Sequence, residues 1–200
     1  MKAVSVVDGT AVALRRSDVD TDQIIPSEWL KRVERTGFGR GLFSEWRDDA
    51  SFVLNRPEHQ GAKIMVAGPR FGTGSSREHA VWALMDYGFE AIISSSFGDI
   101  FRNNSSKQGL VIVQLPTELV EELQTIIEQS PRTHVVIDVE NLRVAVPEFA
   151  WSHNFDMDSI TQERLLQGWD DIGLTLRQAQ TIEQYESTHQ SHALNSALLD

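Results

Sequence analysis

The side chains best suited to chemistry lie together in one stretch, residues 72–80, with the sequence GTGSSREHA. Gly72 and Gly74 let the backbone approach a ligand closely, because glycine has no side chain to hold the ligand away. Arg77 carries a planar set of N–H donors that matches a carboxylate or a phosphate. Two hydroxyl groups complete the set, those of Ser75 and Ser76. The stretch therefore predicts an anion-binding site.

Two common phosphate-binding loops do not fit this stretch. A Walker loop closes with Gly-Lys-Ser or Gly-Lys-Thr, and no such triplet follows Gly74. A dinucleotide-binding loop needs a third glycine at the position that Arg77 takes here. The spacing alone leaves another interpretation open, an ordinary capped helix with an arginine on its surface.

His79 follows the two serines by three and four residues, so on a helix it would share their face. A Ser–His dyad is therefore one hypothesis for this stretch. No acidic residue stands at a spacing that would orient the histidine as a triad requires. The sequence favours a structural histidine.

The stretch lies between a predicted strand at 63–67 and a predicted helix at 80–87, because the apolar spacing changes from continuous to helical across it. Gly88 is expected to end the helix in a left-handed cap. A second strand is predicted at 90–95. Strand, helix and strand together form a βαβ unit, which is expected to cross over right-handedly.

The start of that helix is predicted from Ser75 and Glu78, which have the spacing of a capping box. The helix is therefore expected to begin at Ser75 or Ser76. The first turn of a helix has unpaired N–H groups and a partial positive charge. Both features would favour an anion beside the serines.

Turn signals mark the N-terminal part of the chain. An Asp-Gly pair at 8–9, inside the loosely alternating segment 4–14, predicts a β-hairpin. Asp18, Asp20 and Asp22 are close enough in sequence to bind a divalent cation, but no Gly or Glu completes a calcium-binding loop. A polar turn whose aspartates cap the backbone is the favoured interpretation.

Between this turn and the first strand of the βαβ unit, residues 27–33 predict a short helix, and a glycine-rich loop follows at 37–41. A charged, glycine-punctuated loop is usually solvated and mobile. The polar segment 44–60 has two aromatic residues that are expected to pack, Trp46 and Phe52.

The C-terminal half predicts mainly regular elements. An amphipathic helix is expected at 117–129, and alternating residues at 135–139 and 142–146 predict a hairpin. The other predictions are a strand at 110–115, a loop at 101–109, a helix at 159–167 ended by Gly168, a helix at 175–186 and a disordered tail at 188–200.

Composition limits the kind of partner. The chain has 200 residues, which suits one domain, here 1–187 followed by the tail. With 18 basic and 29 acidic residues, its net charge of −11 disfavours nucleic acid and anionic membranes. It has no cysteine, so it forms no disulfide and no thiolate metal site of its own. No signal peptide and no spanning segment is evident, and a soluble cytoplasmic protein is expected.

Several motifs in order resemble one family. The heptapeptide GSSREHA after Phe71-Gly72 is similar to the signature of the aconitase superfamily's swivelling domain. From residue 1 to about 187 the chain resembles the small subunits of bacterial 3-isopropylmalate dehydratases (isopropylmalate isomerases). The further matching motifs are DTDQIIP at 20–26, RTGFG at 35–39 and DDIGLTL at 170–176. The chain departs from the family at Arg70, where Asn is usual, and at Thr73, where Cys is usual.

The resemblance implies a layered α/β fold of the swivelling-domain type around the βαβ unit, with helices on one side of the sheet. It implies a hydro-lyase that isomerises 2-isopropylmalate to 3-isopropylmalate in leucine biosynthesis by dehydration and rehydration. The implied substrate is a small dicarboxylate. Since this chain has no cysteine, the implied 4Fe–4S cluster belongs to a large subunit that is its partner.

The resemblance also implies roles for individual residues. Ser75 is the implied general base, and Ser76 and Arg77 bind a substrate carboxylate. Leu30 or Val33, in the segment 27–40, is expected to face the isopropyl group. Supporting positions are Asp20 and Asp22, which are expected to orient arginines including Arg77, and Thr21, Gly72, Gly74, Glu78 and His79.

Two alternatives stay open at the level of sequence. One keeps the reaction type and changes the substrate, since homoaconitate, citraconate and dimethylmalate hydro-lyases use similar small subunits. The other is a non-enzymatic anion-binding module built on the same helix start.

Overall fold

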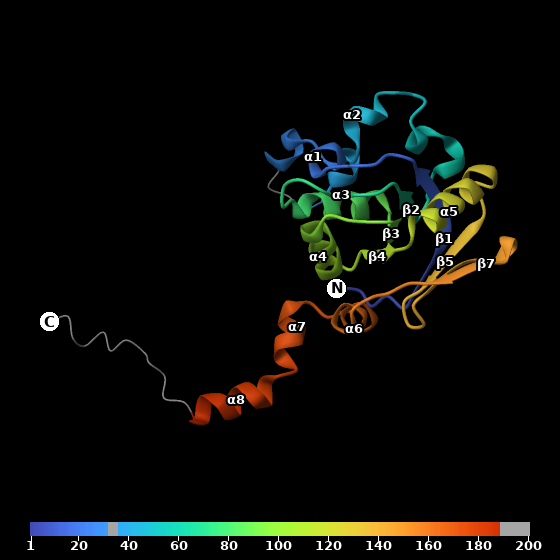
Figure 1. Cartoon of the computed structure of the whole chain (residues 1–200). Helices are drawn as coiled ribbons and strands as arrows, with labels where there is room; N and C mark the ends of the chain where they lie inside the picture. Colours follow the sequence, from blue (N-terminus) through green and yellow to red (C-terminus); the bar gives the residue numbers. More distant parts are fainter. Residues whose placement is uncertain (32–35, 189–200) are drawn as a thin grey trace.

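The computed structural model describes residues 1–31 and 36–188, and a mixed sheet organises them (Figure 1). Its order is β4-β3-β2-β1-β5-β6-β7, with β1 to β4 parallel and β5 to β7 antiparallel. The α/β class and the βαβ unit are confirmed. The strands are β1 Val6–Leu14, β2 Ile64–Ala67, β3 Ala91–Ser94, β4 Val111–Gln114, β5 His134–Asp138, β6 Arg143–Val146 and β7 Trp151–Asn154.

β1 joins the two halves of the sheet, and the predicted hairpin at Asp8-Gly9 is wrong. The first half of β1 pairs antiparallel with β5, and its second half pairs parallel with β2. Both edges of the strand thus have backbone partners, which outweighs the local turn preference of an Asp-Gly pair. A Cβ atom at Gly9 would lie 2.8 Å from Cδ of Lys63, so glycine leaves room for that side chain to lie across the strand.

Helices cover both faces of the sheet, which corrects the expectation of helices on one side. On β2, Met65 packs in the same core as Leu84 of α3 (Glu78–Tyr87). Ile64 packs in the other core with Leu123 of α5 (Thr117–Gln129). Parallel strands buried on both faces are continuously apolar and alternate between two cores. This explains the unbroken apolar sequence of β2, in which all residues are buried.

The C-terminal half follows the predictions in part. The helix at 117–129, the hairpin of β5 and β6, and α6 (Ser159–Gln167) with its cap at Gly168 are confirmed. The loop predicted at 101–109 is wrong, because α4 (Asp99–Gln108) occupies it. Among the residues of α4 only Phe101 and Ser105 are buried, so its sequence has no apolar stripe to predict it from.

The helix predicted at 175–186 is confirmed in part, because α8 (Ala179–Thr188) covers most of it while its first residues belong to a separate helix, α7 (Asp171–Leu176). The side chain of Asp170 starts α7 early by accepting a 2.7 Å hydrogen bond from the N–H of Gly173. In Figure 1, α7 and α8 extend away from the sheet. No residue of α8 is buried. The predicted tail begins at Thr188, the last residue of α8, and otherwise lies outside the described residues.

The connection from β1 to β2 consists of short helical segments. The helix predicted at 27–33 is a 3-10 helix over its described part, and residues 32–35 lie outside the described residues. Trp46 stacks on Phe43 with ring centroids 5.0 Å apart and meets Phe52 at 5.7 Å, which confirms the expected packing. The segments are α1 Thr21–Ile24, η1 Ser27–Lys31, η2 Phe38–Arg40, α2 Ser44–Arg47, η3 Val53–Asn55 and η4 Pro57–His59, and a further one, η5 Pro147–Phe149, precedes β7.

Candidate functional site

The glycine-serine stretch leaves the sheet at the carboxyl ends of β1, β2 and β3, where open α/β sheets bind ligands. Beyond the end of β2, the N–H of Gly72 donates to the oxygen of Val19, at 2.7 Å. The N–H of Phe71 donates to the oxygen of Ser96 on the other side, at 3.1 Å. The segments that follow β1, β2 and β3 thus stay side by side beyond the ends of the strands. The loop is therefore held between two neighbouring segments.

Both glycines have backbone conformations that an L side chain rarely adopts, with φ of 73° at Gly72 and 90° at Gly74. A side chain at Gly72 would collide with the ring of Phe101. The expected close backbone approach is thus an approach to the protein's own core. It places the serines at the end of a tightly packed turn.

The helix after the loop begins later than predicted. α3 starts at Glu78 with Arg77 as its N-cap, and no side chain caps it. The capping box of Ser75 and Glu78 does not form. The carbonyl of Ser75 accepts the hydroxyl of Thr21, at 3.1 Å. The carboxylate of Glu78 accepts from Gln108 of α4, at 2.5 Å. The serines therefore lie in a loop ahead of the helix.

Ser75 and Ser76 are exposed, whereas Arg77 is half-buried. The hydrogen bonds found for Ser75 in the described chain are made by its carbonyl oxygen, which also accepts the N–H of Arg77 at 2.8 Å. This arrangement leaves the Ser75 hydroxyl on the surface, where it can meet a molecule that is not part of this chain.

Arg77 forms an ion pair with Asp22, across the gap between the loop and α1. The Arg77 side chain is 18% exposed and that of Asp22 is 53% exposed, so the pair opens toward solvent on the aspartate side. Nη1 of Arg77 is in ion-pair contact but finds no partner with hydrogen-bond geometry in the described chain. That nitrogen is itself buried against the protein.

Asp20 does not take the role expected for it. Its carboxylate accepts the N–H of Gln23 at 2.8 Å, and the Gln23 side chain accepts the N–H of Asp20 at 3.0 Å. This reciprocal pair is a capping box that starts α1. It agrees with the polar turn favoured from the sequence, and Asp20 orients no arginine among the described residues.

The ring of His79 packs between two aromatic side chains. Its centroid lies 5.3 Å from that of Phe38 and 4.8 Å from that of Trp82, both edge to face. No hydrogen bond joins it to either serine in the part of the chain that the structure describes. This packing supports a structural histidine, which helps fix η2 against α3. The N–H of Gly39 donates to Asp86 on the same helix, at 2.8 Å.

Leu30 and Val33 are the two positions expected to contact the isopropyl group, and the structure describes the first of them. Leu30 is half-buried near the end of η1, which follows α1 closely. Val33 lies outside the described residues. The segment after it is anchored on α3 by the Phe38 and Gly39 contacts above. This coupling joins residues tens of positions apart in sequence, so no local spacing could have predicted it.

Comparison with known proteins tests the resemblance. The family described as Aconitase C-terminal domain matches residues 1–118. A second family, the C-terminal domain of the 3-isopropylmalate dehydratase small subunit, matches residues 171–193. A 3-isopropylmalate dehydratase small subunit from Frankia alni is 57% identical over 188 residues, 94% of this chain and 95% of the relative. This chain belongs to the 3-isopropylmalate dehydratase small-subunit family.

Further relatives of the same family agree. A small subunit from Rubrobacter xylanophilus is 53% identical over 186 residues, 93% of this chain and 94% of that protein. The crystal structure of a 3-isopropylmalate dehydratase from Methanocaldococcus jannaschii matches with a TM-score of 0.66 and 25% identity, over 90% of this chain and 98% of that one. The family and fold expected from the motifs are confirmed.

The two departures from the family pattern lie beside the site. Arg70 forms an ion pair with Asp18, and its N–H donates to Oγ of Ser96 at 2.9 Å. Thr73 forms an isolated β-bridge with Asp20, and the next residue, Thr21, contacts Ser75. Both departures are therefore built into the support of the loop. Neither takes the place of a serine or of Arg77.

The cavity beside α1 is acidic. It has a volume of about 380 Å³, and no basic side chain is among the described residues that line it. Its lining residues are Asp20, Asp22, Gln23, Pro26, Ser27, Glu28 and Glu45. A larger cavity of about 600 Å³ lies between α4, β4 and α6 and includes neither Ser75 nor Arg77. Asp22, the ion-pair partner of Arg77, thus lines an acidic hollow, whose carboxylates would repel an anion.

The described residues contain no group of three or more histidines and carboxylates able to hold a metal ion. The full sequence has no cysteine. The residues of this small subunit therefore do not fit an iron–sulfur cluster, whose irons need thiolate ligands. In residues 1–31 and 36–188, no helix has the length and apolar character needed to cross a bilayer.

Proposed function

We propose that this chain is the small subunit of a 3-isopropylmalate dehydratase, which isomerises 2-isopropylmalate to 3-isopropylmalate in leucine biosynthesis. The reaction removes water and adds it back at the neighbouring carbon. The observation that carries the proposal is 57% identity over 94% of the chain to a protein of that name. The site adds support, because Ser75, Ser76 and Arg77 lie together on one accessible loop.

In this proposal Ser75 takes the proton from the substrate carbon. Its hydroxyl is exposed at the end of a loop whose backbone is held on two sides. Ser76 and Arg77 bind a substrate carboxylate, for which the guanidinium is the natural partner. Asp22 holds Arg77 in place before the substrate arrives. Leu30 and Val33 are proposed to contact the isopropyl group.

A serine hydroxyl is a weak base and needs help from its surroundings. A helix N-terminus stabilises a nearby anion by at most about 2 kcal/mol, which corresponds to about 1.5 pKa units. Because α3 begins only at Glu78, Ser75 receives less than that. Preorganised donors and exclusion of water must supply the larger part. An exposed loop has neither until another surface covers it.

That surface is proposed to be the large subunit. The reaction is proposed to use a 4Fe–4S cluster. Because this chain has no cysteine to bind its irons, the cluster is proposed to be held by cysteines of the large subunit. When bound there, it would supply the Lewis acid that takes the substrate hydroxyl. The proposed working form is thus a cytoplasmic complex of the two subunits.

Co-purification with a candidate large subunit, followed by anaerobic assays, tests the proposal. The complex should convert 2-isopropylmalate, whereas either subunit alone should show no turnover and this chain alone should contain no iron. Homoaconitate, citraconate and dimethylmalate serve as competing substrates. Preference for one of them would change the substrate assigned to the enzyme. Turnover by this chain alone would refute its proposed role as a small subunit.

A further inference from the structure

We infer that Thr21 is a positioning residue, whose hydroxyl sets the location of Ser75 for the reaction. This inference rests on the proposed function, in which Ser75 acts on the substrate. Thr21 was expected only to lie near the site, and its neighbour Asp22 accounts for the contact with Arg77. The hydroxyl of Thr21 makes a different contact, to the backbone of the serine itself.

Thr21 holds the loop at two points. Its N–H donates to the oxygen of Thr73 at 2.9 Å, and its Oγ1 donates to the oxygen of Ser75 at 3.1 Å. The residue is 2% exposed, so water does not readily replace either bond. One buried side chain on α1 thus reaches across to an exposed residue 54 positions later in the chain.

The loop depends on this bond because its other support ends earlier. Gly72 is fixed by its bond to Val19, two residues before Gly74 begins a second turn with positive φ. Glycine has the widest choice of backbone conformations, so Gly74 cannot by itself fix the residues after it. The ion pair of Arg77 acts on a side chain beyond the serines. Between these two supports, the Ser75 carbonyl accepts a local bond from the N–H of Arg77 at 2.8 Å and a long-range bond from Thr21 at 3.1 Å, and the bond from Thr21 ties the serine to α1.

Thr21 is itself held firmly. It is the first residue of α1, behind the capping box of Asp20 and Gln23. Its carbonyl accepts the N–H of Ile25 at 3.0 Å, and Ile25 is fully buried. The hydroxyl is therefore presented from a fixed backbone. A shift of about 1 Å in a reacting group can lower the rate by about a hundredfold.

The test uses four variants in the complex of both subunits, which are Thr21→Val, Thr21→Ser, Ser75→Ala and the combination of Thr21→Val with Ser75→Ala. Thr21→Val keeps the shape and removes the hydroxyl, and Thr21→Ser keeps the hydroxyl and removes the methyl group. Thr21→Val should lower kcat by roughly ten- to a hundredfold, with KM changed by less than about threefold, because Arg77 keeps its own support. Thr21→Ser should stay within about threefold of the parent chain. In a chain that already carries Ser75→Ala, Thr21→Val should cause no further loss.

A measurement without turnover checks the same inference. In the full-length chain, Thr21→Val should speed amide hydrogen exchange at residues 73–77, and Thr21→Ser should not. Unchanged exchange in Thr21→Val, or equal loss of kcat in both variants, would overturn the inference and assign Thr21 a packing role. Independent losses from Thr21→Val and Ser75→Ala would overturn it as well. If Ser75→Ala alone leaves kcat intact, the proposed role of Ser75 fails, whatever the exchange data show.

Discussion

Ser75 and Arg77 are two residues apart but lie in different surroundings. The serine is exposed and its side chain caps no helix, whereas the arginine is largely covered and paired with Asp22. A substitution of the serine should therefore affect chemistry with little effect on folding. A substitution of the arginine changes a charge that both the protein and the substrate use.

Ser75→Ala should lower kcat of the complex by about a hundredfold or more, since general bases contribute about 10²–10⁴. The free energy of unfolding should change by less than about 0.5 kcal/mol, because the exposed hydroxyl supports no other group. Steady-state kinetics and thermal unfolding of the same preparation measure both. Near-normal kcat in this variant, together with loss of activity in His79→Ala, would instead support a Ser–His dyad.

Arg77→Lys should raise KM more than it lowers kcat. Lysine keeps the positive charge next to Asp22 but replaces a planar pair of donors with a point charge. A charge-assisted hydrogen bond is worth about 1.5–3 kcal/mol, so KM should rise by roughly ten- to a hundredfold. The comparison is with Arg70→Lys, whose parent residue pairs with Asp18 outside the proposed contacts. Similar KM in both variants would argue against carboxylate binding by Arg77.

Leu30→Ala should change substrate preference. If this half-buried side chain meets the isopropyl group, its loss should lower kcat/KM for 2-isopropylmalate by roughly ten- to two-hundredfold. Diacids with a smaller substituent should be affected less. The same result is expected for Val33→Ala. Equal losses on branched and small substrates would show that the segment positions the subunit and does not contact the substituent.

At the scale of elements, the connection from β1 to β2 places one ionisable group inside the protein. His59 of η4 is 6% exposed, and its Nδ1 has no hydrogen-bond partner in the described chain. Burial lowers the pKa of His59, against a smaller opposing effect of the neighbouring Glu58. The folded protein therefore favours neutral histidine more strongly than the unfolded chain does.

This burial predicts a loss of stability on acidification. The unfolded chain binds a proton near pH 6.5, before the folded protein does, so protons stabilise the unfolded state as the pH falls below that value. The urea concentration at the midpoint of unfolding should decrease when the pH is lowered from about 7.5 to about 5.5. In His59→Gln this decrease should be smaller. A decline of the same size in His59→Gln would assign the effect to other groups.

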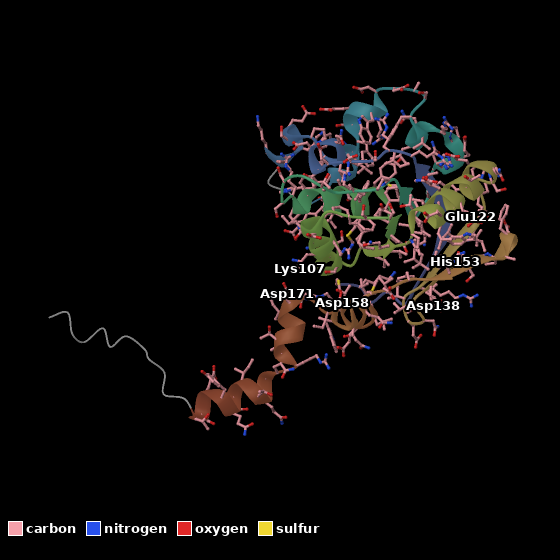
Figure 2. The ribbon with its side chains drawn as sticks, in the orientation of Figure 1. Lys107, Glu122, Asp138, His153, Asp158 and Asp171 are labelled. Carbon is pink, nitrogen blue, oxygen red and sulfur yellow. The ribbon has the colours of Figure 1, made fainter. Side chains whose placement is uncertain are left out.

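At the scale of the whole molecule, ion pairs attach the first residue of α7 to α4 and α6. Asp171 contacts Arg164 at 2.7 Å and Lys107 at 3.2 Å, and these two bases lower its pKa. Figure 2 shows Lys107 and Asp171 close together at the start of α7. Beyond this contact two apolar side chains of α7 are open to water, with Ile172 69% and Leu176 67% exposed. This part of the chain should contribute little to folding.

Replacement of both Ile172 and Leu176 by alanine should change the free energy of unfolding by less than about 0.5 kcal/mol. Leu165→Ala, in the neighbouring α6, is the matched control, because Leu165 is 1% exposed and its truncation should cost about 2–5 kcal/mol. Urea unfolding compares the three chains. A large loss in the double variant would mean that these side chains are covered in the folded protein.

The sequence by itself determined the elements whose signals are local. The helix at 117–129, the hairpin of β5 and β6, and the cap at Gly168 follow from apolar periodicity and turn chemistry within a few residues. The serines and Arg77 could also be proposed as a site from the sequence, because they are contiguous. Family motifs supported the same stretch and the same fold class.

Only the tertiary structure decided how these pieces are held. The Asp8-Gly9 pair is a turn signal, but it lies within a strand, because β5 pairs with it and β2 pairs with the later half of the same strand. The helix after the serines starts only at Glu78, and the Ser75 carbonyl ahead of it accepts the hydroxyl of the distant Thr21. The partners in such contacts are more than 50 residues apart in sequence, so spacing within a motif has no information about them. Hydrogen bonds and packing choose among locally similar conformations only when the whole chain has folded.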